Sequence, residues 1–255
     1  MWGDFLVRII CRLVALIYIL MSLSSAAEKG QHKLYFDIDS DGGWVPILTA
    51  AQPGSPGIMT EITEAIQRHS NIEFVPIKLP QKRAEIALTV GSVDFDFICL
   101  EWLKTPEVGS EYVISDPFFE LKESFITLKK NVPLFPTRES LHNKHVGTIA
   151  GYFYFDDNTF IRTDFLDENN LILGLKHERF DVIILEQETA KHWAKMNDVD
   201  IGFAVLHSKG NFLMRLRKKN QGLLPSINQA IKQIKASGEL QAILDKHNTE
   251  ISIFN

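Results

Sequence analysis

The chain has 255 residues, of which 45% are hydrophobic and 23% are charged, and its formal net charge at pH 7 is -5. This composition is typical of a globular protein with enough apolar residues for one large core or two small ones. Because the balance is mildly acidic and the basic residues are scattered, there is little electrostatic basis for nucleic-acid binding, and that class is set aside.

Residues 1–27 have the features of a secretory signal peptide. Two arginines precede a mostly apolar run over 13–23, which is roughly half the length of a bilayer-spanning helix. We expect cleavage after Ala26 or Ala27 and a soluble product in the periplasm; an uncleaved membrane anchor is the alternative. Cys99 is then the only cysteine, and its apolar neighbours predict a buried, inert thiol.

The next part of the chain alternates between expected strands and helices. Apolar residues at every second position predict a strand over 32–38, and apolar residues three or four apart predict a helix that begins near Ile58. A strand over 71–77, a helix over 81–90 and a buried strand over 93–100 follow. This order is typical of parallel βαβ units.

Two loops at strand ends carry the first candidate site residues. Trp44 lies in the loop after the first strand, and Glu101, Trp102 and Lys104 follow the third strand. In an open α/β sheet the ligand binds beyond the carboxyl ends of the strands, so we expect both loops to face a cleft.

The second half is expected to repeat this pattern and then return. A long strand over 123–129 leaves the first lobe and a strand over 210–217 comes back, so the chain crosses twice between two lobes, as a hinge requires. We expect lobe 1 to comprise 32–128 and 212–255, and lobe 2 to comprise 129–211. The other predicted elements are strands over 145–149 and 179–185 and helices over 169–176, 223–235 and 239–247.

Several motifs, in this order, resemble the bacterial extracellular solute-binding proteins of family 3, the polar amino acid binding type. They are GSVD, SDPFF, HVGTIAGYFY, ERFDVIIL and KASGELQAILDKH. The resemblance implies an α/β fold of the type 2 periplasmic binding protein kind, with two lobes of mixed sheet and flanking helices joined by two crossover strands. It also implies closure on a small polar solute, an amino acid or a related compound, for an ABC importer, by a monomer without a cofactor or metal.

The same resemblance implies roles for individual residues. Trp44 stands where the family has an aromatic residue that packs on the ligand, and Asp41 precedes it at a frequently acidic position. Glu186 stands where the family usually has an Asp that accepts the ligand's ammonium group. Tyr152 follows the glycine that begins a helix in lobe 2, where backbone N–H groups can meet a carboxylate.

One position departs from the family's pattern. Val108 stands where the amino acid binders have an Arg that grips the α-carboxylate through two hydrogen bonds. An apolar side chain cannot do this. Lys104 or Arg83 could supply a cation instead, although Lys would offer a point charge rather than a fork.

Each candidate also has a structural interpretation. The two tryptophans could pack in the core, Glu186 could cap the following helix, Asp41 could hold an Asp-Gly-Gly turn, and the two basic residues could be solvated. An enzyme on the same fold is a second hypothesis, with Glu186 or Glu101 as the general acid or base of a dehydratase or lyase. A sensor that docks on a membrane receptor is a third.

Overall fold

The computed structural model describes residues 32–39, 43–49 and 56–253. The predicted signal peptide, its cleavage sites and Asp41 lie outside these ranges. A search of the described helices finds none that is long and apolar enough to cross a membrane. The described residues form a mixed α/β fold whose two lobes share one sheet.

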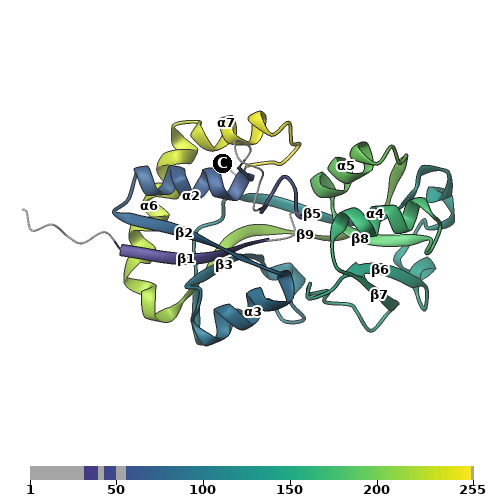
Figure 1. Ribbon diagram of the computed structural model, residues 1–255, viewed down its shortest axis with the longest axis horizontal. Helices are drawn as coiled ribbons and strands as arrows, with labels where there is room; N and C mark the ends of the chain where they lie inside the picture. Colours follow the sequence, from purple (N-terminus) through teal and green to yellow (C-terminus); the bar gives the residue numbers. More distant parts are fainter. Residues whose placement is uncertain (1–31, 40–42, 50–55, 254–255) are drawn as a thin grey trace, which may run out of the picture. The chain divides into compact units, whose positions relative to one another are not determined.

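Nine strands of the described chain form this sheet (Figure 1). They are β1 (His32–Asp39), β2 (Ile72–Leu79), β3 (Phe95–Cys99), β4 (Tyr112–Ile114), β5 (Phe119–Leu128), β6 (His145–Ile149), β7 (Ile161–Phe165), β8 (Val182–Glu186) and β9 (Ile201–Arg217). Their order across the sheet is β2-β1-β3-β9-β5-β8-β6-β7, and β4 pairs with β9 as well. The pairs β1–β3, β6–β8 and β6–β7 are parallel, while β9 and β5 are antiparallel to their neighbours.

Helices cover the sheet in both lobes. They are α2 (Ile58–Arg68), α3 (Gln81–Val90), α4 (Glu168–Lys176), α5 (Gln187–Met196), α6 (Leu224–Ala236) and α7 (Glu239–Lys246). In lobe 1, α2, α6 and α7 lie on one face of the sheet and α3 lies on the other (Figure 1). This separation matters for the site, because α3 covers the face that carries the polar residues of β1 and β3.

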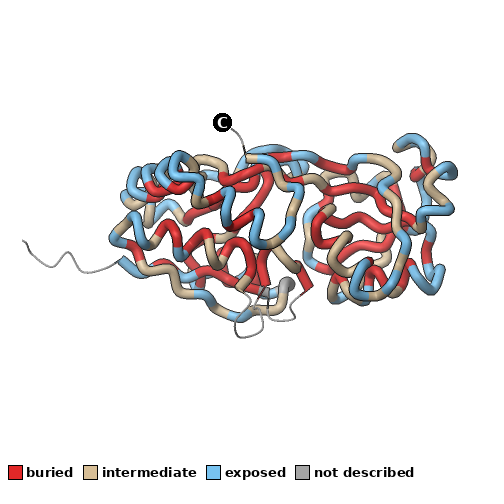
Figure 2. The backbone as a smooth tube through the Cα atoms, turned by 90° about the horizontal axis from the view of Figure 1, so that it is seen from above, coloured by how far each residue is buried: buried red, intermediate tan, exposed pale blue. Residues whose placement is uncertain are grey.

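Each lobe has its own buried apolar residues, and Figure 2 shows buried segments in the interior of both. In lobe 1 the alternating residues Leu34, Phe36 and Ile38 pack with the α2 stripe that contains Ile62 and Ile66. In lobe 2, one apolar cluster combines residues of β5, β6 and β8 with α4 and α5, and a second combines the same three strands with connecting residues such as Phe135 and Tyr154. Apolar residues three or four positions apart in the sequence predict a buried stripe of this kind on α2.

Two long strands run through both lobes, in agreement with the predicted double crossing. β5 and β9 pair from Phe119 opposite Phe212 to Leu128 opposite Ile201. Phe119 belongs to the apolar core of lobe 1, whereas Ile126 belongs to that of lobe 2. The lobe boundaries at residues 128 and 212 stay a prediction.

The C-terminal tail forms a further link between the lobes. After α7, Ser252 forms an antiparallel bridge with Glu120 of β5. Two residues earlier, Glu250 pairs with Lys191 of α5 at 2.6 Å. The tail therefore touches one of the crossing strands and a helix of lobe 2.

The prediction of a helix after Gly151 was wrong. Gly151 has a φ of 95°, and the following residues form turns until β7, which pairs directly with β6. Tyr154 is buried and its hydroxyl accepts a hydrogen bond from the backbone N–H of Ile149 at 3.0 Å. Phe155 stacks on His207 with ring centroids 4.8 Å apart.

Candidate functional site

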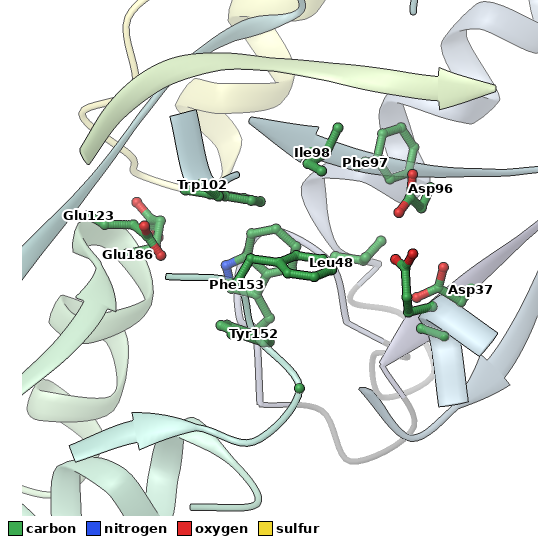
Figure 3. A pocket seen from close by; sticks show the side chains of 14 residues that line it. Asp37, Leu48, Asp96, Phe97, Ile98, Trp102, Glu123, Tyr152, Phe153 and Glu186 are labelled. Atoms are coloured by element: carbon green, nitrogen blue, oxygen red, sulfur yellow. The ribbon is translucent and has the colours of Figure 1, made fainter. Parts of the chain in front are cut away.

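A pocket of about 730 Å³, including the space at its mouth, is lined by residues of both lobes (Figure 3). Lobe 1 contributes the loop after β1, the start of α3, β3 and the turn that follows it. Lobe 2 contributes the turn after β6 and the ends of β5 and β8. The apolar part of the wall consists mainly of Trp44, Leu48, Phe97, Trp102, Tyr152 and Phe153.

Trp44 is the centre of an aromatic group that includes both lobes. Its ring centroid lies 6.0 Å from that of Trp102, 5.6 Å from Phe212 and 6.2 Å from Tyr152. Trp44 is 8% exposed and also belongs to the lobe 1 core. Its buried indole N–H has no hydrogen-bond partner among the described residues. Trp44 therefore both packs in the core and lines the pocket.

Two buried glutamates stand side by side at one end of the pocket. Glu123 of β5 is in register with Glu186 of β8, and both line the pocket. The Glu186 carboxylate accepts hydrogen bonds from the backbone N–H groups of Glu188 and Thr189, each at 2.9 Å, and so caps α5. Burial raises the pKa of Glu186 to about 7, although these two hydrogen bonds act in the opposite direction.

A polar network lies behind Glu123. Its carboxylate accepts from the Ser208 hydroxyl at 2.7 Å and lies 3.3 Å from Nδ1 of His207. The other ring nitrogen of His207 lies 2.7 Å from Asp156, which also pairs with Arg138 at 2.9 Å. Burial alone would lower the pKa of His207, but the two carboxylates outweigh it and the pKa is raised. The two carboxylates therefore stabilise the imidazolium form relative to that of a free histidine.

Three further carboxylates and one guanidinium form the other end. Phe36 of β1 is in register with Phe95 of β3, which places the next residues, Asp37 and Asp96, side by side on the opposite face. Arg215 of β9, the cross-strand partner of Asp96, donates to it at 3.0 and 2.5 Å. The same guanidinium donates to Glu85 of α3 at 2.8 Å. Figure 3 shows Asp37 and Asp96 on one side and Glu123 and Glu186 on the other, with apolar side chains between them.

The lobes touch closely beside Trp44. The indole N–H of Trp193 on α5 donates to the backbone carbonyl of Gly43 at 2.5 Å. A Cβ atom at Gly43 would lie 1.8 Å from Oε2 of the buried Glu168. Tyr152 donates to the other oxygen of Glu168. A side chain at position 43 would therefore force the Glu168 carboxylate to shift while the lobes are in this contact.

A family model described as bacterial extracellular solute-binding proteins, family 3, matches residues 38–250. The chain belongs to this family. A probable histidine-binding protein of Campylobacter jejuni is 24% identical over 233 residues, which cover 89% of this chain and 90% of that protein. The arginine-binding extracellular protein ArtP of Bacillus subtilis is 23% identical over 235 residues, which cover 88% and 89%.

A solved structure supports the same fold. It is an ABC uptake transporter substrate-binding protein from Streptococcus pneumoniae with bound histidine. The TM-score is 0.70 at 19% identity, and the match covers 88% of this chain and 95% of that one. The predicted fold, a two-lobed type 2 periplasmic binding protein, is confirmed.

Four of the candidates that the sequence of this family 3 protein suggested meet at one pocket. They are Trp44, Trp102, Tyr152 and Glu186. For Glu186, the capping role and the place on the pocket wall occur together. Their contact with a ligand stays a prediction.

Three other candidates lie elsewhere. Lys104 is exposed and pairs with Asp157 across the lobes at 3.2 Å. Glu101 is exposed and packs on β9, where a Cβ at Gly210 would lie 1.9 Å from its Oε2. Arg83 is exposed and is not among the residues that line the pocket. Neither basic residue therefore replaces the missing Arg in this arrangement, and Val108 itself is half-buried away from the wall.

The sequence reasoning missed most of the acidic wall. Asp37, Glu85, Asp96 and Glu123 were not singled out, and neither was Phe153. The alternation in β1 and β3 places both aspartates opposite the core, so their shared face was readable. Within the described ranges, no group of three or more His, Cys, Asp or Glu residues is placed to hold a metal ion. Cys99 is a buried free thiol, as expected, and burial raises its pKa well above the usual value.

Proposed function

We propose that this family 3 protein captures a small polar solute, an amino acid or a related compound, in the pocket between its lobes. The observation that carries the proposal is the shared wall: Trp44 and Trp102 come from lobe 1, and Tyr152 and Glu186 come from lobe 2. A solute held by all four would contact both lobes at once. Such contacts exist only when the lobes are together, so the solute's differential affinity drives closure.

The chemistry of the wall supports a ligand that is polar but partly apolar. The indole and phenyl faces offer apolar contact, and the buried carboxylates offer acceptors for a cationic group. The histidine- and arginine-binding names of the relatives are consistent with this chemistry.

We further propose that the mature protein begins after Ala26 or Ala27, acts as a monomer in the periplasm and delivers its solute to an ABC permease. In this proposal lobe 1 comprises 32–128 and 212–255, and lobe 2 comprises 129–211. The family description, extracellular solute-binding proteins, supports the export step. Sequencing the N-terminus of the protein recovered from the periplasm tests it; a protein that retains residue 1 and stays in the membrane fraction would contradict it.

The test of solute capture starts from the bound molecule. Mass spectrometry of the material released on denaturation identifies the solute, and calorimetry then measures its affinity for the stripped protein. We expect Trp44→Ala to weaken binding by about tenfold or more, because a buried aromatic face is lost. Phe203→Ala, an exposed aromatic residue of β9 that is not on the pocket wall, is the matched control. Equal affinities in the two variants would remove Trp44 from the site.

One observation favours catalysis as a second candidate function. A carboxyl group with a pKa of about 7 inside an aromatic pocket is suited to act as a general acid, so Glu186 could serve a dehydratase or lyase. Incubation of the bound solute with the protein for hours distinguishes the two. Recovery of the intact solute contradicts catalysis, and a product that requires Glu186 supports it.

A further inference from the structure

We propose that Glu123 of β5 accepts a hydrogen bond from an N–H group of the solute, and that His207 and Ser208 of β9 are positioning residues for this carboxylate. The inference rests on the proposed solute-binding function and names a specificity-determining residue of that site. It is carried by a bulge between the two strands that run through both lobes. The bulge places two donors on one oxygen of Glu123, and no donor of the described residues reaches the other oxygen.

The pairing of β5 with β9 is irregular at Glu123. Glu123 lies opposite Ser208, but the next residue of β5, Ser124, lies opposite Leu206, so His207 is the extra residue of a β-bulge. In a regular strand, the side chains of neighbouring residues point to opposite faces. Here His207 and Ser208 are neighbours, and yet both contact the Glu123 carboxylate. Bulges re-aim side chains in this way and are frequent beside functional sites.

The two oxygens of Glu123 have different surroundings. Oε2 accepts a hydrogen bond from the Ser208 hydroxyl at 2.7 Å and lies 3.3 Å from Nδ1 of His207. Within the described part of the chain, no hydrogen bond or ion pair reaches Oε1. This oxygen is also not among the polar atoms that are sealed off without a partner. Since Glu123 is 5% exposed and lines the pocket, Oε1 is the atom that is available to a solute.

Both ring nitrogens of His207 face carboxylates, which fixes the direction in which the ring donates. Nε2 lies 2.7 Å from Asp156, and Nδ1 faces Glu123. A neutral imidazole carries one N–H and can donate to only one of the two, whereas the imidazolium form donates to both. Asp156 is held in turn by Arg138 at 2.9 Å. The side chains behind Glu123 therefore orient its carboxylate before a solute arrives.

The His207 ring is enclosed by aromatic side chains. Phe155 stacks on it with ring centroids 4.8 Å apart, and the rings of Phe125 and Tyr154 stand edge-on at 5.3 and 5.9 Å. The side chain of His207 has no exposed surface. His207 therefore does not touch a solute itself, and its effect on binding passes through Glu123.

The neighbouring Glu186 differs from Glu123 in this respect. Its two oxygens accept hydrogen bonds from the backbone N–H groups of Glu188 and Thr189, one each. Figure 3 shows Glu123 and Glu186 together at one edge of the pocket, so a solute group that reaches one of them is near the other. A group with N–H donors suits this edge, because carboxylate oxygens only accept hydrogen bonds when ionised. An anionic oxygen of a solute would be repelled here.

The experiment is calorimetry on protein purified from cells that express the full chain, unfolded and refolded to remove bound solute. The probes are L-arginine, L-lysine, L-histidine and L-glutamine, together with the molecule that denaturation releases. We expect Glu123→Gln to weaken binding of the tightest probe by about tenfold, because a charged acceptor becomes neutral. Glu64→Gln, an exposed carboxylate of α2 that is absent from the wall, is the matched control and should bind as the native protein does.

A double-mutant cycle tests the positioning role. Ser208→Ala and His207→Asn each remove one donor to Glu123 and should weaken the tightest probe by about threefold or more. In a Glu123→Gln background, the same changes should have less than about a twofold further effect, because the residue through which they act has already lost its charge. The exposed His142→Asn is the control for His207. Where thermal unfolding shows that His207→Asn does not fold, Ser208→Ala completes the cycle.

The native protein provides a measurement that needs no variant. In protein with isotope-labelled histidine, nuclear magnetic resonance at pH 6 should find a proton on both ring nitrogens of His207. Addition of the tightest probe should shift the Nδ1 signal, since this nitrogen faces Glu123. A single ring proton would overturn the positioning role, and a probe that binds without a shift of Nδ1 would overturn the contact with Glu123.

The outcomes separate this inference from the function on which it rests. A Glu123→Gln protein that binds the tightest probe as the native protein does would overturn the contact, and losses that simply add in the cycle would overturn the positioning role. Solute capture would stand in both cases. A native protein that binds no probe and releases no molecule on denaturation would contradict the proposed function, and this inference with it.

Discussion

Glu186 holds two positions at once, as the N-cap of α5 and as part of the pocket wall. The hydrogen bonds that its carboxylate accepts from two backbone N–H groups favour the charged form, while its nearly complete burial favours the neutral form. Glu188 on its own helix and Glu123 on β5 add negative charge nearby. A cation in the pocket would shift this balance toward the carboxylate and release a proton.

The affinity for a cationic solute should therefore rise with pH. From pH 6 to pH 8, Glu186, whose pKa is about 7, ionises in the free protein and makes the pocket more negative. We expect roughly a tenfold gain in affinity, measured by calorimetry in buffers of equal ionic strength. Glu186→Gln should lose its part of the gain, and an unchanged pH profile in this variant would show that Glu186 does not titrate in this range.

The stability of the solute-free protein should change with pH in the opposite direction. The folded-state pKa of Glu186, about 7, is above the ordinary value of 4.5, so between these values the folded protein binds more protons than the unfolded chain. Stability then falls as pH rises through this window, and the loss from this residue is on the order of 1–3 kcal/mol. Urea unfolding of native protein and Glu186→Gln at pH 5 and pH 8 measures it; an equal pH dependence in both would contradict the assignment.

At the scale of residues, the sequence predicted the candidate site residues that follow strand ends, but it did not predict the acidic residues of the pocket wall. Trp44 and Glu186 were readable because loops after parallel strands face the same edge of a sheet. Asp37 and Asp96 could be assigned to the face opposite the core. Their adjacency depends on the register of β1 with β3, and their place on the pocket wall depends on how α3 lies over that face. Neither the register of the two strands nor the position of α3 can be predicted from the residue spacing within one strand.

At the scale of elements, Gly43 lies at a close contact between the lobes. Any side chain there would meet the carboxylate of Glu168, which is 2% exposed and would have to shift. Gly43→Ala should weaken solute binding by about tenfold or more, because closure would cost a steric clash, while the Tm of the solute-free protein stays nearly the same. Calorimetry and thermal unfolding give the two values.

Gly222 provides the control for this variant. A Cβ at Gly222 would have no neighbour within 4 Å, so Gly222→Ala should leave both affinity and Tm unchanged. A Gly43→Ala protein that binds solute as the native protein does would mean that the contact with Glu168 is not part of the solute-bound state.

Some elements were predicted with their observed bounds, and others were not. The helix over 81–90 and the strand over 145–149 have the bounds that the sequence predicted. β9 begins at Ile201 rather than Gly210, and β5 begins at Phe119 rather than Glu123. The bounds of α5 were not predicted because its buried face consists largely of small or polar residues, such as Ala190 and Ala194. β7 was missed because the helix expected in that region was wrong.

At the scale of the molecule, three of the four tryptophans stand where the lobes meet. Trp44 and Trp102 line the pocket, and Trp193 of α5 donates to Gly43 of the facing lobe. The fourth, Trp2, lies in the predicted signal peptide. Intrinsic fluorescence of the mature protein should therefore report closure directly.

We expect a saturable change in tryptophan emission when solute is added. Trp193→Phe should reduce the amplitude of this change and weaken binding only a few-fold, since it removes one hydrogen bond between the lobes. Fluorescence titration and calorimetry on the same samples measure the two effects. A solute that binds by calorimetry without any change in emission would show that the environment of the three indoles is the same in both states.

The bridge of Ser252 to Glu120 and the ion pair of Glu250 with Lys191 have a practical consequence for anyone who handles this molecule. A purification handle or fluorescent fusion attached soon after Ser252 would lie beside β5, one of the two strands that run through both lobes, and its bulk could interfere with closure of the lobes. A C-terminal fusion that can be cleaved off is therefore preferable, and a reporter insertion is better placed in a surface turn far from the contact of the tail with β5 and α5.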